Sequence, residues 1–379
     1  MKNLMMRRDF LRGSAALTGV WSMGADVSAG VGNRWRFVSI PDFLNNDIRY
    51  PEPGWEDSLS YVLKSIKAEQ PDFVLVPGDL IQGQWNKTKE GVEHWADVFY
   101  PAWIKRMQDH GFKFYTAIGN TELGDHPRAK DVPAFKRKFR EHLKMPLNGP
   151  EDMKGTAFWF KHKNCLFISV DLFELGQSKK NGVTLGVTGR QLQWFEQTIA
   201  NNRGVDYIIV MGHLPLVGPV RRRASSTMGL DGSRQSGFWK SMSKNKVHLY
   251  LCGHVHAITC TRFDGVLQIV HGGLFGYNPT VNYLVATVQS DQIQLQLKQI
   301  EIVNTGGELF QPGREKWCPQ KVVRIPEQAK RTGFVTLASL VLDKVTDRVK
   351  LNTDSEDFIY TPNSFRDVDL EMYLRFQRK

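Results

Sequence analysis

Six side chains that can bind metal ions recur along the sequence, each shortly after an apolar run. In chain order they are Asp42, Asp79, Asn120, His213, His254 and His256. Four of the five segments that carry them have a glycine directly before the polar residue, and glycine permits a sharp backbone turn. The two carboxylates, one amide and three imidazoles form a mixed oxygen and nitrogen donor set. Such a set favours divalent zinc, manganese or iron over calcium or a thiolate-bound metal.

The apolar runs before these residues have the pattern of strands, and longer amphipathic stretches alternate with them. The predicted strands are 36–40, 73–76, 114–118, 165–170, 207–211 and 247–252, and the predicted helices are 56–69, 92–108 and 191–199. Later runs at 267–270, 283–288 and 293–297 predict antiparallel strands that close a second sheet. Ligands of open α/β sheets bind beyond the carboxyl ends of the strands, so the polar side chains should meet in one crevice.

In order and spacing, these segments resemble the calcineurin-like metallophosphoesterases over about residues 34–300. The family pattern D-x-H, G-D, G-N-H-(D/E), G-H and G-H-x-H appears here as Asp42-Phe43-Leu44, Gly78-Asp79, Gly119-Asn120-Thr121-Glu122, Gly212-His213 and Gly253-His254-Val255-His256. The resemblance implies a layered α/β fold, an α/β/β/α sandwich with two mixed sheets. It places the phosphoesterase domain at residues 30–302.

The resemblance also implies two divalent cations, which would be manganese, zinc or iron. Asp79 would bridge them, Asp42 and His256 would hold the first, and Asn120, His213 and His254 would hold the second. Two cations about 3.5–4 Å apart can hold a bridging hydroxide, polarise the phosphoryl group and neutralise developing charge. The implied reaction is hydrolysis of a small phosphate mono- or diester, with a metal-bound hydroxide attacking phosphorus.

Two positions depart from the family pattern. Leu44 stands where the family has a metal-binding His, so the first cation loses a ligand unless a neighbour such as Asp47 replaces it. The alternative is that Asp47 lies in a surface loop and binds no metal. Thr121 replaces the His that faces the leaving group, and a hydroxyl is a poor general acid near neutral pH. His126 in the same loop could supply that acid. These departures leave open the alternative that the protein is a catalytically impaired family member that binds one metal ion and a phosphorylated ligand.

Arg221 and Arg222 lie between the fourth and fifth segments, where loops border the crevice. They could hold a second phosphate or a diester substituent, and a solvated loop is the alternative. The formal net charge of +11 suits an anionic substrate or a polyanion. A polyanion- or envelope-binding protein is therefore a further alternative, although nucleic acid is not expected as the partner.

Residues 1–29 are expected to be an export signal. Arg7-Arg8-Asp9-Phe10-Leu11-Arg12 resembles the twin-arginine signature, and the uncharged run at 13–25 is shorter than the about 20 residues of a membrane-spanning helix. This predicts recognition by the twin-arginine export machinery, a location in the periplasm or cell envelope, and no transmembrane anchor.

The rest of the composition bounds the fold. A chain of 379 residues that is 41% hydrophobic and 23% charged is not a disordered tail, a collagen-like fibre or a small disulfide-stapled domain. Cys165 and Cys252 lie in apolar runs and are expected to be buried thiols. For the C-terminal extension, residues 303–379, an addition to the second sheet, a β cap and a contact with another subunit all stay open.

Overall fold

The structure is a computed structural model, and the following description concerns residues 34–42, 54–81, 89–124, 127–176, 182–218, 220, 228–273, 280–305, 322–344, 348–352 and 360–361. These residues belong to one unit, residues 33–379. The predicted export signal lies outside them, as do Leu44, Asp47, His126, Arg221 and Arg222. Among the described helices, none has both the length and the hydropathy of a membrane-spanning segment.

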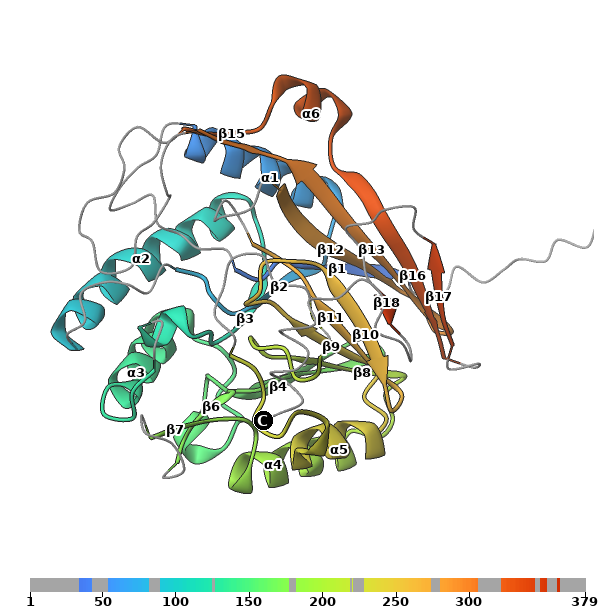
Figure 1. Ribbon diagram of the computed structural model, residues 1–379. Helices are drawn as coiled ribbons and strands as arrows, with labels where there is room; N and C mark the ends of the chain where they lie inside the picture. The colour runs from blue at the N-terminus through green and yellow to red at the C-terminus, as the bar shows by residue number, and fades with distance from the viewer. Residues whose placement is uncertain are drawn as a thin grey trace, which may run out of the picture. The chain divides into compact units, whose positions relative to one another are not determined.

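The first sheet has seven strands in the described part of the chain, in the order β17-β16-β13-β12-β1-β2-β3 (Figure 1). Its parallel strands are β1 (Trp35–Ser39), β2 (Phe73–Pro77) and β3 (Phe114–Ala117). Its antiparallel strands are β12 (Thr280–Val288), β13 (Gln292–Glu301), β16 (Val335–Asp343) and β17 (Arg348–Asn352).

The second sheet also has seven strands in the described residues, in the order β18-β10-β11-β9-β8-β5-β4. Its central parallel strands are β5 (Cys165–Ser169), β8 (Tyr207–Met211), β9 (Leu249–Cys252) and β11 (Val266–Val270). The outer strands are β4 (Phe158–His162), β10 (Thr259–Phe263) and β18 (Tyr360–Thr361). The predicted buried thiols are confirmed, because Cys165 and Cys252 are buried and unpaired in this sheet.

Helices lie outside the two sheets and complete the α/β/β/α layers (Figure 1). They are α1 (Trp55–Ala68), α2 (Lys89–Asp109) and α3 (Val132–Leu143) beside the first sheet, and α4 (Gly189–Ala200) and α5 (Gly237–Lys244) beside the second. The α1 segment forms an amphipathic helix because Leu59, Val62, Leu63 and Ile66 recur on one buried face. The predicted fold class is confirmed.

Aromatic side chains join the two sheets in the core. Phe37 of β1 and Phe73 of β2 stack with ring centroids 5.8 Å apart. The ring of Phe167 from β5 meets Phe37 edge-on at 5.5 Å and Phe73 at 5.2 Å. Edge-to-face aromatic pairs stabilise a fold by more than the burial of their surface area alone. These contacts therefore hold together the two sheets that carry the site.

Short elements complete the described chain. They are the β-hairpin β6 (Phe173–Leu175) and β7 (Val183–Leu185), the pair β14 (Val303–Thr305) and β15 (Val322–Arg324), the helix α6 (Glu327–Thr332), and 3-10 turns at Thr121–Leu123, Glu151–Met153 and Ser233–Gln235. Beyond residue 302, β16 and β17 extend the first sheet and β18 pairs with β10 of the second.

The predicted grouping of the late strands is wrong in one respect. The run at 267–270 is β11, which lies parallel to β9 inside the second sheet. The runs at 283–288 and 293–297 are β12 and β13, and they extend the first sheet because β12 pairs with the free edge of β1. Hydrophobic periodicity reports which residues form a strand, but not which distant strand is its partner.

Candidate metal centre

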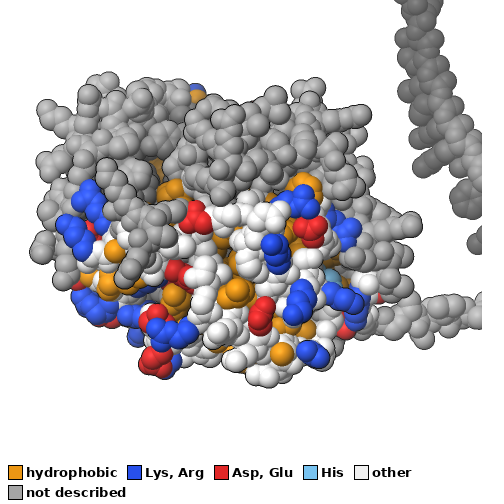
Figure 2. All heavy atoms as spheres, turned by 60° about the horizontal axis from the view of Figure 1, so that its bottom comes forward, with side chains coloured by type: hydrophobic (Ala, Val, Ile, Leu, Met, Phe, Trp, Pro, Cys, Tyr) orange, Lys and Arg blue, Asp and Glu red, His pale blue; other side chains and the backbone are white. Residues whose placement is uncertain are grey.

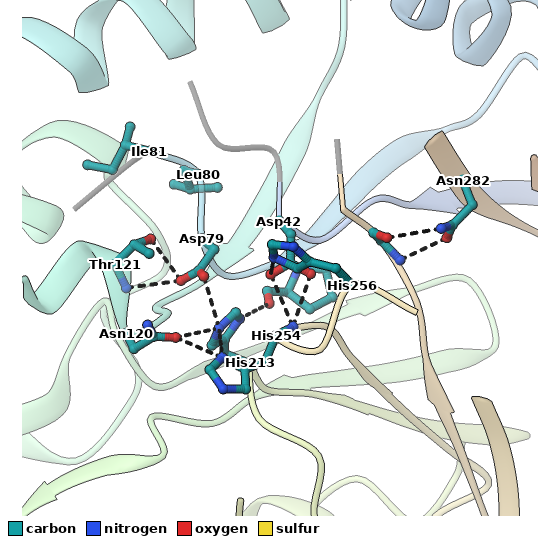
Figure 3. A network of polar contacts seen from close by, with 12 residues as sticks. Asp42, Asp79, Leu80, Ile81, Asn120, Thr121, His213, His254, His256 and Asn282 are labelled. Carbon is teal, nitrogen blue, oxygen red and sulfur yellow. Dashed lines mark hydrogen bonds and ion pairs between the residues drawn. The ribbon is translucent and has the colours of Figure 1, made fainter. Parts of the chain in front are cut away.

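The carboxyl ends of five parallel strands meet at one edge of the sandwich and bring the six predicted donor side chains together (Figure 3). The donors follow β1 (Asp42), β2 (Asp79), β3 (Asn120), β8 (His213) and β9 (His254 and His256). Each is buried, and the most exposed of them, His256, is 6% exposed. Polar groups buried to this degree need hydrogen bonds or a bound ion to offset the loss of water.

His213 lies at the centre of this group. Its Nδ1 is 2.9 Å from the carbonyl oxygen of Pro77, and because a carbonyl only accepts, Nδ1 carries the hydrogen. Its Nε2 is 2.8 Å from Asn120 Oδ1 and 3.3 Å from Asp79 Oδ2. In neutral His213, Nε2 would therefore point a lone pair at two oxygen atoms. A positive charge among these atoms, either a proton on His213 or a metal ion, would satisfy them.

The same atoms fit a divalent cation. Ligand atoms of Asp79, His213 and His254 all lie within 4.8 Å of one another. Asn120 Oδ1 adds a fourth donor, 3.0 Å from Nδ1 of His254, which is itself 3.2 Å from Nε2 of His213. Ligands bound to a metal at about 2.0–2.2 Å lie about 3 Å from one another, as these atoms do. We call these four residues the Asp79 cluster.

Asp42 and His256 lie beside the Asp79 cluster. Both carboxylate oxygens of Asp42 are 3.0 Å from the backbone nitrogen of His254, and Nε2 of His256 is 3.4 Å from Asp42 Oδ1. These are the residues that the family resemblance assigns to the first cation. With Asp79, which the resemblance implies would be shared, that cation would have three donors among the residues the structure describes.

Four of the donors have backbone conformations that most residues avoid. Asp42, Asp79, His254 and His256 have φ of 56°, 56°, 73° and 51°. Asp and His are among the residues that tolerate this left-handed region, and non-glycine residues held there cluster at functional sites. The strained turns aim side chains from the ends of separate strands into one place.

Two of the glycines that precede the donors are required for different structural reasons. Gly78 has φ of 83° and provides the sharp turn that the sequence predicts. Gly119 is required by close approach instead, because a Cβ there would lie 2.2 Å from Oδ1 of Asp79. The β2 and β3 loops can therefore approach each other only when residue 119 has no side chain.

Glu122 braces the turn that carries Asp79, a role that the sequence analysis did not assign. Its Oε2 accepts the backbone N–H groups of Asp79 at 2.9 Å and Gly119 at 2.7 Å. Its Oε1 accepts those of Leu80 at 2.8 Å and Ile81 at 3.4 Å. The signal was its position in the G-N-x-(D/E) segment, which sets an acid two residues after Asn120.

Thr121, which is predicted to face a leaving group, contacts Asp79. Its hydroxyl donates to Oδ1 of Asp79 at 2.8 Å, and its backbone N–H donates to the same oxygen at 3.0 Å (Figure 3). Thr121 is thus a hydrogen-bond partner of the central carboxylate. The other oxygen of Asp79, Oδ2, faces Nε2 of His213 and is therefore the one directed at the other donors.

Burial and mutual charge set the protonation of the cluster. Burial raises the pKa of Asp79, but the charges of His213 and His254 outweigh it and lower that pKa to about 2. Burial lowers the pKa of His213, but Asp79 and Asp42 outweigh it and raise that pKa to about 9. For Glu122, burial and the charge of Asp79 raise the pKa to about 8. Burial and the charge of His213 lower the pKa of His254 well below its usual value.

The raised pKa values of His213 and Glu122 predict that the metal-free protein loses stability as the pH rises, whereas the lowered pKa of His254 acts in the opposite direction only near and below its ordinary value of 6.5. His213 (pKa 6.5 raised to about 9) and Glu122 (4.5 raised to about 8) bind their protons more tightly in the folded state. The stability that each group contributes is fully present below its pKa in the unfolded state. That contribution is lost as the pH rises through its pKa in the folded state. Urea unfolding with a chelator should show a midpoint that falls from pH 6 to pH 9. Added zinc or manganese should raise the midpoint most at pH 9, because ligating imidazoles must be neutral. A pH-independent midpoint would contradict these shifts.

Comparison with known proteins gives one family and several similar folds. A model of the calcineurin-like phosphoesterase family matches residues 37–257. No curated protein matches the chain. Among solved structures, GAP50, the anchor in the inner membrane complex of Plasmodium, is 15% identical with a TM-score of 0.43, over 70% of this chain and 84% of that chain.

Two bacterial structures are similar at comparable identity. A Staphylococcus aureus protein provisionally designated a 5′-nucleotidase, in complex with α-ketoglutarate, is 16% identical with a TM-score of 0.41. The match covers 67% of this chain and 51% of that one, so this chain spans about half its length. Phosphopantetheinyl hydrolase from Mycobacterium tuberculosis is 14% identical with a TM-score of 0.29, over 64% of this chain and 91% of that chain.

Proposed function

Because the chain belongs to the calcineurin-like phosphoesterase family, we propose that it is a metal-dependent hydrolase of phosphate mono- or diesters. The observation that carries the proposal is the Asp79 cluster, four buried donors that converge on one place, where a positive charge would stabilise them. A site built for a cation at the edge where ligands of α/β sheets bind suits catalysis on a phosphoryl group.

When bound, divalent cations polarise a phosphoryl group, neutralise its charge and lower the pKa of water. The chain's own residues hold and orient the donors. The Pro77 carbonyl fixes the ring of His213, so that Nε2 faces inward. Thr121 holds one oxygen of Asp79, and the N–H of His254 holds Asp42. In our proposal Asp79 is shared by two cations, as the family resemblance implies.

The test is a set of phosphate mono- and diesters assayed with chelated protein that is reloaded with manganese, zinc or iron. Elemental analysis of the same samples counts the bound metal. We expect turnover only after reloading and two metal ions per chain. One ion per chain without turnover would favour the alternative of an impaired, phosphate-binding member, which the smaller number of described donors around Asp42 supports. Neither metal nor turnover would contradict both functions.

The alternative of polyanion binding finds no support on the face where α4 and α5 lie. On that face, the described Lys and Arg side chains are interspersed with Asp, Glu and apolar side chains (Figure 2). Elsewhere, basic residues of α3 are engaged by acids, such as Lys138 by Asp97 at 2.8 Å and Arg137 by Glu93 at 2.7 Å. Binding to a polyanion instead needs clustered basic side chains that are free to pair with phosphates.

We further propose export by the twin-arginine machinery, on the motif at residues 7–12 alone. The small phosphorylated substrate would then be met in the periplasm or cell envelope.

A further inference from the structure

The hydroxyl proton of Thr121 is already used within the site. Its Oγ1 lies 2.8 Å from Oδ1 of Asp79, and the backbone N–H of Thr121 donates to the same oxygen at 3.0 Å. Thr121 is 5% exposed, and a Cβ at Gly119 would lie 2.2 Å from the same Oδ1 of Asp79. A hydroxyl has one hydrogen to donate, so Thr121 cannot hold Asp79 and protonate a departing oxygen at the same time.

The other acidic groups beside Asp79 that the structure describes are also engaged. Both oxygens of Glu122 face backbone N–H groups of the β2 and β3 loops, at 2.7 to 2.9 Å for the three shortest. The N–H of His213 points to the Pro77 carbonyl. A general acid must lie within hydrogen-bond reach of the atom it protonates. Within the described residues, the Thr121 hydroxyl, both oxygens of Glu122 and Nδ1–H of His213 are thus directed at protein partners.

We propose that this site acts on substrates whose leaving group departs without enzymic protonation, namely phosphoanhydrides and aryl phosphates rather than alkyl phosphates. In that reaction water adds to phosphorus and loses a proton to solvent, and the bond from phosphorus to the leaving oxygen breaks. The leaving oxygen keeps the electron pair and takes a proton from solvent afterwards. A phosphate or phenolate carries that charge well, whereas an alkoxide does not. Thr121 is then a positioning residue for Asp79.

This inference rests on the proposed phosphoesterase function, and one series of substrates separates the two. The metal-loaded protein is assayed with aryl phosphates of graded leaving-group pKa, an alkyl phosphate and a nucleoside diphosphate. We expect kcat/KM to fall steeply with leaving-group pKa and the alkyl ester to be slower by about 10²-fold or more, the usual contribution of a general acid. Comparable rates for aryl and alkyl esters would overturn the inference but leave the function intact. No turnover on any substrate would overturn the function, and the inference with it.

Variants test the role of Thr121 within the same series. Thr121→Val removes the hydroxyl but keeps the backbone N–H bond, and Thr121→Ser keeps both. We expect Thr121→Val to weaken zinc or manganese binding by about 10- to 100-fold, as loss of a partner that orients a ligand does. Its rates should fall equally on every substrate, so that the slope against leaving-group pKa is unchanged, and Thr121→Ser should behave as the unaltered protein. A loss confined to alkyl esters would show that Thr121 acts on the leaving group.

His126→Ala provides the remaining arm, since His126 is the other candidate for the general acid. We expect the variant to keep the slope of the unaltered protein. A slope that becomes steeper in His126→Ala would show that His126 donates the proton, and would overturn the inference.

Discussion

Replacing His213 with alanine should lower kcat/KM on phosphate esters by about 10³-fold, because bound metal supplies several kcal/mol of transition-state stabilisation. His213 is the residue through which the donors of the Asp79 cluster meet. Its Nε2 lies within 3.3 Å of an atom of Asp79, Asn120 and His254. Removing the ring leaves those three donors around an empty space and deletes one ligand. Titration of the chelated protein with zinc or manganese should show the same loss as weakened binding.

His248→Ala is the matched control. His248 also bonds to backbone, accepting the N–H of Ile208 at 3.1 Å, but it lies before β9 at the opposite end of the strand from the donors. We expect this variant to keep its metal affinity and its activity. Equal losses in the two variants would point to a general effect on folding, and full activity in folded His213→Ala would exclude His213 as a ligand.

The sequence indicated the donors because each one follows a strand whose pattern is local. The run at 73–76 is apolar throughout and is followed by Gly78 and Asp79, and the run at 207–211 is followed by His213. In the structure both runs are buried strands with these donors at their carboxyl ends. Parallel strands end at a common edge, so strand prediction was sufficient to predict the convergence.

The supporting bonds could not be predicted in the same way, because their partners are distant in the chain. Asn282 of β12 accepts the N–H of Gly272 at 2.8 Å and donates to its carbonyl at 2.9 Å (Figure 3). A Cβ at Gly272 would lie 3.0 Å from Oδ2 of Asp42. Asn282 therefore ties the loop after β11 to the first sheet beside Asp42. Nothing in the local pattern around Asn282 marks it for that role, since its partner depends on how the two sheets pack.

The direction of the Thr121 hydroxyl is a case of the same kind. Sequence alone shows that threonine replaces histidine, which removes a general acid. It does not show whether the hydroxyl faces the substrate or the protein. The bond to Oδ1 of Asp79 settles the direction, and it does so because Gly119 lets that carboxylate approach the β3 loop.

Above pH 8, where Glu122 is charged, replacing it with glutamine should destabilise the protein by about 2–4 kcal/mol, because hydrogen bonds to a charged acceptor each contribute about 1.5–3 kcal/mol. The carboxylate of Glu122 accepts backbone N–H groups with both oxygens. An amide has one oxygen, so its NH₂ group would face an N–H donor. The turn at Asp79 would then lose a bond on one side, and we expect zinc or manganese affinity to fall by about 10- to 100-fold. Urea unfolding and metal titration measure the two effects separately.

Glu174→Gln separates positioning from general stability. Glu174 is likewise a buried acid, and it accepts the backbone N–H of Thr188 at 2.9 Å and the side chain of Gln191 at 2.7 Å. It braces the start of α4 rather than a donor loop. We expect Glu174→Gln to lose stability while it keeps its metal affinity. If Glu122→Gln and Glu174→Gln lower metal affinity equally, the loss in both follows from weaker folding. If only Glu122→Gln lowers it, the carboxylate acts on the site through the turn at Asp79, whose backbone N–H groups it accepts.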